Sequence, residues 1–237
     1  MVGTIINTAA ILIGGVCGHL FGKLLKERHQ ETLTMACGVG TLFLSIAGAM
    51  NYMLHHDQLP GGGSMLVIAC LALGGLIGEI LNIECQFERF GEWLKQKTGN
   101  ARDQQFVNGF VTASLTVCIG AMAIMGSIQD GISGDWSTLG AKSILDLIII
   151  MVMTCSLGKG CVFSAIPVFL WEGSLTLLAT AVRPVMTDTA MAYLSLVGSV
   201  LIFCVGVNLV WGKRIRVANL LPAVILSVIA AFLPIRF

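Results

Sequence analysis

The chain has 237 residues, of which 56% are hydrophobic and only 11% are charged, and its formal net charge is +1. Soluble domains carry about 25% charged residues, so this chain has too few ionised groups to cover a water-exposed globule. The composition excludes an ordinary soluble protein and predicts a polytopic α-helical membrane protein. The near-neutral charge gives no reason to expect a nucleic-acid partner.

Apolar segments of membrane-spanning length recur along the chain. A helix needs about 20 mostly apolar residues to cross the hydrocarbon core of a bilayer. We expect an all-α bundle of about eight transmembrane helices, forming a single integral membrane domain over residues 1–237, with spans at 3–22, 35–54, 64–83, 105–128, 139–157, 161–181, 189–211 and 217–235. Only Gly158-Lys159-Gly160 separates the fifth span from the sixth, which is enough for a tight turn between antiparallel helices.

Lys and Arg residues are concentrated in alternate connections between the spans. The odd-numbered connections carry Lys23, Lys26, Arg28, Arg89, Lys95, Lys97, Arg102, Lys159, Lys213, Arg214 and Arg216, whereas the other side carries only Lys142, Arg183 and Arg236. Cytoplasmic loops are the positively charged ones, so we expect the odd-numbered connections inside and both termini outside.

The segment 85–98, with the sequence CQFERFGEWLKQKT, is too polar to span a membrane. Phe87, Phe90 and Leu94 recur at helical spacing, with Trp93 beside them and charged residues between them. This pattern predicts an amphipathic helix on the inner membrane surface. The alternative is a soluble cap over the bundle.

Two glycine-rich segments indicate an internal repeat. LIGGVCGHLFG in the first span is similar to LGGLIGEIL in the third, and TLFLSIAGAM in the second to TVCIGAMAIM in the fourth. Residues 1–54 and 64–128 would then be parallel hairpin repeats. Glycines four residues apart allow close helix contact in lipid, so Gly14 with Gly18, and Gly74 with Gly78, predict that the first and third spans pack on each other or across a dimer axis.

Several motifs together resemble a known family. They are GTIINTAAILIGG from Gly3, FVTASLTVCIGAMAIMGSIQDG from Phe110, KSILD from Lys142, FSAIPVFLWEG from Phe163 and NLLPA from Asn219. The chain is similar over nearly its whole length to the YdfK/YqgA-like family, bacterial inner-membrane proteins with a domain of unknown function. The resemblance implies a multi-pass protein of the bacterial inner membrane and supplies no activity. Ala121 departs from a position where relatives often have proline, which argues against a kink in the fourth span.

Cysteine, histidine and catalytic motifs give no sign of a metal, a cofactor or an enzyme. Seven of the eight cysteines lie in or beside apolar runs and none forms a CxxC pair, so we interpret them as small apolar residues, with a soft-metal path as the alternative. His55 and His56 with Asp57 could bind a metal ion or form a solvated turn. The chain has no HExxH, Walker, GxSxG or dinucleotide-binding motif.

Polar side chains inside the predicted spans are the candidate functional residues. An ionised side chain at mid-bilayer costs about 2.5–3.5 kcal/mol on insertion scales, so such residues usually face a bundle interior or a hydrated cavity. Asp146 and Glu172 are the candidate carriers of a proton or cation. The residues that could bind a substrate or ion beside them are Asn7, Ser114, Thr116, Gln129, Asp130 and Lys142. Alternatives remain for several: Asn7 can simply bridge helices, Glu172 can bond a neighbouring hydroxyl, and Asp130 can end a helix.

Lys142 and Asp146 are one helical turn apart and can contact each other. We expect Lys142 to extend outward to the interface and Asp146 to point inward, because the shorter side chain cannot reach water. Two interpretations stay open: a structural ion pair that holds the fifth helix against a neighbour, or a cavity-lining aspartate that handles a proton or cation.

Two functions follow from these residues. The first is a proton- or cation-coupled permease for a small solute. The second is a non-transporting membrane scaffold or sensor, in which the glycines build a homo-oligomer and segment 85–98 meets a cytoplasmic partner.

Overall fold

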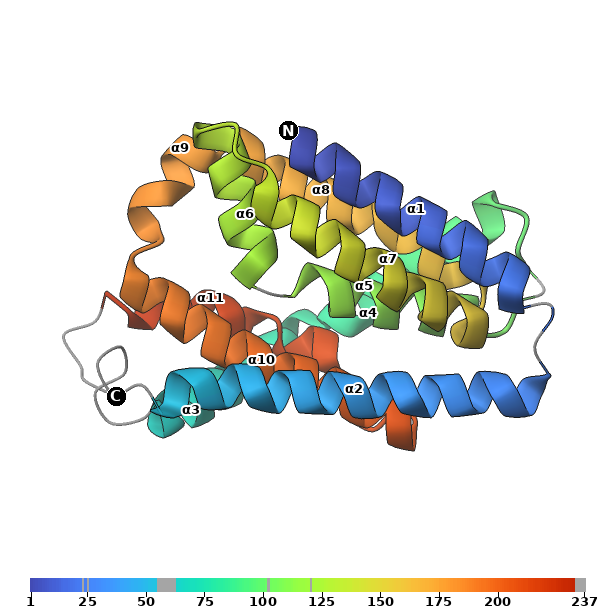
Figure 1. Cartoon of the computed structure of the whole chain (residues 1–237). Helices are drawn as coiled ribbons and strands as arrows, with labels where there is room; N and C mark the ends of the chain where they lie inside the picture. Colours follow the sequence, from blue (N-terminus) through green and yellow to red (C-terminus); the bar gives the residue numbers. More distant parts are fainter. Residues whose placement is uncertain (23, 25, 55–62, 102, 120, 233–237) are drawn as a thin grey trace. The chain divides into compact units, whose positions relative to one another are not determined.

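The computed structural model describes the whole chain except residues 23, 25, 55–62, 102, 120 and 233–237 (Figure 1). The candidate metal ligands His55, His56 and Asp57 lie outside the described residues, as do Lys23, Arg102 and Arg236 of the predicted charge pattern.

The regular structure of the described residues is entirely helical, which confirms the predicted all-α class. The helices are α1 (Val2–Gly22), α2 (Glu27–Leu54), α3 (Ser64–Leu81), α4 (Ile83–Lys97), α5 (Phe106–Cys118), α6 (Ala121–Ile132), α7 (Ser137–Leu157), α8 (Ala165–Leu177), α9 (Ala179–Val182), α10 (Asp188–Trp211) and α11 (Pro222–Ala230), with short 3₁₀ helices η1 (Lys159–Ser164), η2 (Arg183–Val185) and η3 (Val217–Leu220).

Six described helical segments are long and apolar enough to cross a membrane, and a seventh is possible if a bent pair counts as one span. Two of the eight predicted spans account for the difference. The fourth is divided into α5 and α6, and the last, predicted at 217–235, is the shorter apolar helix Val217–Ala230.

The fourth predicted span bends sharply although Ala121 replaces the family's proline. Its two parts, Phe106–Cys118 and Met122–Ile132, are inclined by 61°. The expectation of an unkinked span is therefore wrong. The sequence has a glycine between the two parts, and glycine disfavours a helix interior by about 1 kcal/mol relative to alanine, so a bend between them does not require proline.

The chain divides into two compact units. Unit 1 consists of Met1–Cys37, Gln86–Cys118 and Met122–Thr180, and unit 2 of Gly38–Cys85, Ile119–Ala121 and Ala181–Phe237. The boundaries of these units differ from those of the proposed repeat, 1–54 and 64–128. The single domain and the repeat stay predictions.

In unit 1, α1 packs lengthwise against α7 (Figure 1). Glycines make this contact close: a Cβ atom on Gly14 would collide with the Leu147 carbonyl, and one on Gly18 with the Met151 carbonyl. Close backbone approach of this kind replaces the hydrophobic drive that helices lack in lipid.

In unit 2, the matching glycines of α3 pack on the C-terminal segment. A Cβ atom on Gly74 would collide with the backbone of Ala223 in α11, and one on Gly78 with that of Asn219 in η3. The expectation that the first and third spans use these glycines against each other is therefore wrong. Each pair is already occupied by a helix that lies far along the chain in its own unit.

The two units share one type of connection. Both α7 and α10 end at a Gly-Lys pair whose glycine has a positive φ, +85° at Gly158 and +76° at Gly212. A 3₁₀ helix follows in each case, then the next α-helix. A positive φ is easy only for glycine, which is why the helices stop there.

The predicted amphipathic segment is a helix, α4, docked on α5. Leu94 is buried, and a Cβ atom on Gly91 would touch the ring of Phe110. Phe90 and Trp93 stack with ring centres 5.8 Å apart and remain exposed. A position on the inner membrane surface stays a prediction.

Candidate functional site: a buried charged cluster

Four polar side chains from three helices of unit 1 form what we call the charged cluster: Asn7 of α1, Lys142 and Asp146 of α7, and Glu172 of α8. Their exposed fractions are 0%, 6%, 4% and 1%. Asn7 reaches the cluster because it lies on the same face of α1 as Gly3, Gly14 and Gly18, which hold that helix on α7.

Hydrogen bonds and ion pairs connect all four members. Asn7 Nδ2 donates to Asp146 Oδ2 at 3.0 Å and to Glu172 Oε1 at 2.8 Å. Lys142 Nζ forms an ion pair and hydrogen bond with Asp146 Oδ2, and it lies 3.5 Å from Glu172 Oε1. The two carboxylates therefore share the same amide donor and the same ammonium group.

Lys142 takes a different direction from the one we predicted. Its ammonium group turns inward to the two acids instead of extending to the interface. The physical reason is charge: an inward lysine offsets two carboxylates that would each cost several kcal/mol to bury without a partner. The Lys142–Asp146 ion pair is thus present, and its structural role stays a prediction.

Two oxygen atoms of the cluster have no hydrogen-bond partner among the described residues. They are Asn7 Oδ1 and Glu172 Oε2, both fully enclosed. Leaving a buried acceptor unsatisfied costs about 1–3 kcal/mol, and more for a charged group. The cluster thus has spare acceptor capacity on residues that are themselves almost completely buried.

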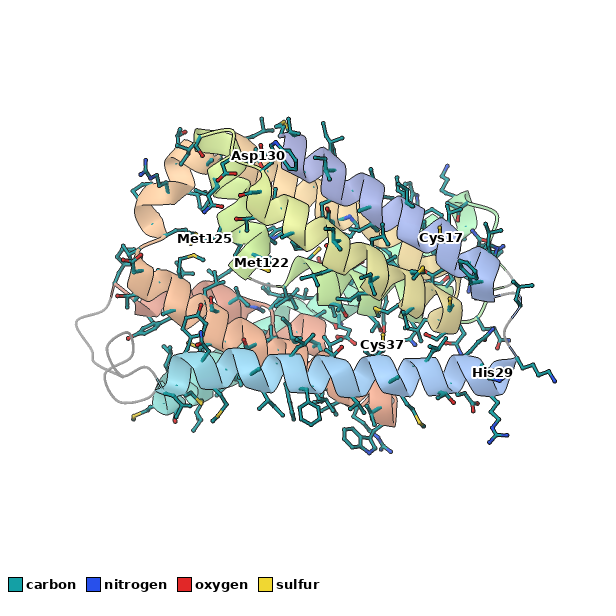
Figure 2. All side chains as sticks on the ribbon, in the orientation of Figure 1. Cys17, His29, Cys37, Met122, Met125 and Asp130 are labelled. Atoms are coloured by element: carbon teal, nitrogen blue, oxygen red, sulfur yellow. The ribbon has the colours of Figure 1, made fainter. Side chains whose placement is uncertain are left out.

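Further polar side chains lie between the cluster and the first residues of α1. Thr4 Oγ1 and Thr176 Oγ1 are 3.2 Å apart, and Thr176 Oγ1 also donates to the Glu172 carbonyl. Beyond them lies Asp130, labelled in Figure 2. Its Oδ2 atom accepts from the Gly3 N–H at 3.0 Å and pairs with the amino group of Met1 at 2.7 Å. Asp130 therefore joins α6 to α1 and does not contact the cluster.

The remaining predicted site residues are Ser114, Thr116 and Gln129. Gln129 accepts a hydrogen bond from Thr138, and Thr116 donates to the Thr112 carbonyl of its own helix. Ser114 is buried, and its hydroxyl has no partner within the described part of the chain. None of these three hydrogen-bonds to the cluster in the described structure.

Thr176 and Cys118 are the site residues that we did not predict. Cys118, at the end of α5, is close enough to Lys142, Asp146 and Glu172 to interact with them electrostatically. Thr176 follows Glu172 by four residues, so helical spacing alone could have identified it. No sequence pattern indicated Cys118, because α5 comes near the cluster only through tertiary packing.

The loop before α7 helps to set the start of that helix. Asp135 Oδ1 accepts a hydrogen bond from the Ser137 N–H at 3.0 Å, and this bond lowers the pKa of the Asp135 carboxyl. An ionised Asp135 near the N-terminus of α7 also suits the helix dipole.

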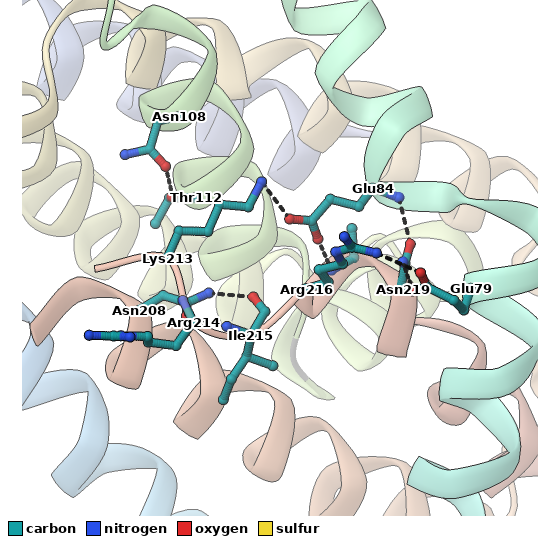
Figure 3. Close-up of polar contacts among 11 residues, drawn as sticks. Glu79, Glu84, Asn108, Thr112, Asn208, Lys213, Arg214, Ile215, Arg216 and Asn219 are labelled. Atoms are coloured by element: carbon teal, nitrogen blue, oxygen red, sulfur yellow. Dashed lines mark hydrogen bonds and ion pairs between the residues drawn. The ribbon is translucent and has the colours of Figure 1, made fainter. Parts of the chain in front are cut away.

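Unit 2 contains a second polar network, centred on Asn219 (Figure 3). Asn219 Oδ1 accepts from the Glu84 N–H at 2.7 Å, and Nδ2 donates to Glu79 Oε2 at 2.6 Å. Glu84 pairs in turn with Lys213 at 2.8 Å, and Arg216 pairs with Glu79. These bonds join the corner between α3 and α4 to η3 and to the residues that precede it, and no sequence pattern indicated them.

Metal-binding clusters are not found in the described part of the chain. No group of three or more His, Cys, Asp or Glu side chains is placed there to hold a metal ion. The eight cysteines, of which Cys17 and Cys37 are labelled in Figure 2, form no disulfide within the described structure.

Comparison with known proteins identifies one family and two relatives. The family model described as "Protein of unknown function (DUF554)" matches residues 2–232. The chain is 30% identical over 232 residues to the "Uncharacterized membrane protein YdfK" of Bacillus subtilis, covering 98% of this chain and 96% of that one. It is also 30% identical over 231 residues to the "Uncharacterized protein YqgA" of Escherichia coli, covering 96% and 94%. No solved structure matches. The resemblance seen in the motifs is confirmed.

Proposed function

We propose a function for this chain, which belongs to the DUF554 family of proteins of unknown function: it is a proton- or cation-coupled permease for a small solute. The chain is a membrane protein with several helices of spanning length. The proposal is carried by one observation, the meeting of Lys142, Asp146 and Glu172 in the interior of unit 1.

Packing alone gives no reason to place three ionisable groups there. The α1–α7 contact is already made by glycines against backbone, which needs no charge. Replacing a buried ion pair with apolar residues is often neutral or stabilising, so such a pair adds little to stability. Ionisable residues inside membrane spans mark ion pathways and proton relays in other membrane proteins, and this supports a transport role for the cluster.

The broken span α5–α6 also supports transport. Cys118 ends α5 within electrostatic range of the cluster, and the chain bends by 61° just beyond it. Transporters commonly place their ion sites beside discontinuous helices, because the interrupted helix leaves backbone groups available to a ligand.

We place the protein in the bacterial inner membrane with both termini outside, from the Lys and Arg pattern and the family resemblance. In this orientation Thr4, Thr176 and Asp130 lie between the cluster and the outer surface. They would give a solute or proton a polar route to Glu172.

The test is flux through proteoliposomes that contain a pH-sensitive dye, challenged with a panel of inorganic salts, amino acids and organic acids. Asp146→Asn and Glu172→Gln keep side-chain size, and each should reduce solute-dependent pH change at least tenfold. Asp188→Asn, which alters an exposed acid at the start of α10, is the matched control and should transport normally. Equal flux and equal pH dependence in the two cluster variants and the wild type would refute the role of the cluster.

The exposed face of α4 favours a second function, a scaffold or sensor that oligomerises and binds a cytoplasmic partner. Phe90 and Trp93 are 38% and 51% exposed, although Leu94 and Gly91 of the same helix are buried. Crosslinking and pull-down with Trp93→Ala, against the control Gln96→Ala, test this function. Loss of a partner by the Trp93 variant without loss of flux would favour the scaffold.

A further inference from the structure

We infer that the charged cluster binds one monovalent cation at Asn7 Oδ1 and Glu172 Oε2, either a proton or a small ion such as an alkali cation or ammonium. This inference rests on the proposed function and names the species that the cluster would couple to transport. Asn7 is then a ligand of the cation, and the Lys142 ammonium group competes with the cation for the same acids.

The first argument is the type of atom left without a partner. Both unsatisfied atoms of the cluster are oxygens, and both belong to side chains that are at most 1% exposed. The orientation of the Asn7 amide follows from its neighbours, because only its NH₂ group can donate to the two carboxylates. Its oxygen is therefore left as an acceptor. A ligand that satisfies two acceptors must be a proton, a hydrogen-bond donor or a cation, and an anion is excluded.

The second argument is charge. The cluster holds one base, Lys142, and two acids, Asp146 and Glu172, with the neutral amide of Asn7 between them. Thr4 and Thr176 beside Glu172 and the Cys118 thiol on α5 are neutral or weakly acidic neighbours of the cluster. With both acids ionised, one negative charge has no counter-charge in the cluster, so a single positive charge makes it neutral.

The third argument concerns Lys142. Its ammonium group lies against Asp146 Oδ2 and 3.5 Å from Glu172 Oε1, so it occupies the position between the acids that a bound cation would also prefer. Lys142 leaves Glu172 Oε2 without a partner. A bound cation at Oε2 would repel the ammonium group, and removal of Lys142 would strengthen cation binding.

The experiment is thermal unfolding of the purified full chain in detergent, at constant ionic strength. One series replaces choline chloride by LiCl, NaCl, KCl or NH₄Cl at fixed pH, and another varies the pH in choline chloride alone. A ligand at 100 times its dissociation constant should raise Tm by roughly 5–10 °C. A saturable rise with one salt identifies an alkali or ammonium ion, and a rise on acidification in choline alone identifies a proton.

Isosteric variants assign the response to the site. Glu172→Gln and Asp146→Asn each remove one negative charge and should abolish it, whereas Lys142→Met should increase the apparent affinity at least tenfold. Asp188→Asn is the control and should respond as the wild type does. A wild-type Tm that depends on neither small cations nor pH overturns the inference, as does an undiminished response in Glu172→Gln.

The result is separable from the proposed function. Cation binding without flux in proteoliposomes would support the site and reject the permease. Flux of a solute that depends on neither cations nor pH would reject both the site and the coupling, and would leave only transport of the solute.

Discussion

Substituting Gly18 by alanine tests how strongly the glycine contact between α1 and α7 positions the charged cluster. The added Cβ atom would collide with the Met151 carbonyl and lie 2.9 Å from the Cβ atom of Thr154. The Met151 carbonyl is backbone and the Thr154 Cβ atom is bonded directly to the backbone, so no side-chain rotation relieves the clash. Ordinary carbon contacts are about 3.5–4.0 Å, so relieving the Thr154 contact alone requires the helices to separate locally by about 0.6 Å, and the closer Met151 carbonyl requires more.

A gap of this size has two measurable consequences. Overpacking of a tight contact costs about 1–3 kcal/mol, which corresponds to a Tm lower by roughly 2–12 °C for a chain of this length. The same displacement, if it reaches Asn7, would lengthen its hydrogen bond to Glu172 from 2.8 Å to roughly the 3.5 Å at which such bonds cease. We therefore expect Gly18→Ala to weaken both stability and any cation response of the cluster.

The assay is thermal unfolding in detergent, with Gly40→Ala as the matched control. Gly40 is a helical glycine of α2 with no atom within 4 Å of the position a Cβ would take. Alanine there should leave stability unchanged or raise it by about 0.5–1 kcal/mol, because helical glycine is entropically unfavourable. If the Gly18 and Gly40 variants unfold at the same temperature, the close α1–α7 contact does not exist as described.

Two further predictions concern the polar networks. Lys142→Met alone should destabilise the protein by about 3–5 kcal/mol because it leaves buried carboxylates without their ammonium partner, whereas Lys142→Met combined with Asp146→Leu should recover most of that loss in thermal unfolding. Recovery of stability without recovery of flux would support a transport role for the pair, and recovery of both would leave it purely structural. In unit 2, Asn219→Ala should cost about 2–4 kcal/mol because it leaves the Glu84 N–H and Glu79 with fewer partners, and Gln96→Ala on the exposed face of α4 should cost under 0.5 kcal/mol. Equal stability of these two variants would show that the Asn219 bonds are not formed.

The polar groups of the site were recognisable in the sequence because each stands out locally. Asp146, Glu172 and Asn7 interrupt apolar segments, and burying a charged or amide group in hydrocarbon requires a reason. The sequence could not tell which of them meet. Asn7 is 139 residues from Asp146 and 165 from Glu172, and it contacts both only because α1 packs on α7 and α8.

The sequence by itself determined the all-α membrane class, most of the spans and the family, because the bilayer requires about 20 apolar residues per helix whatever the fold. Tertiary structure alone decided that Lys142 turns inward, that Gly14 and Gly18 face α7, and that Cys118 accompanies the acids. The physical reason is that hydropathy is a property of each segment, whereas the partner of a charge or a glycine depends on which helix face lies opposite it.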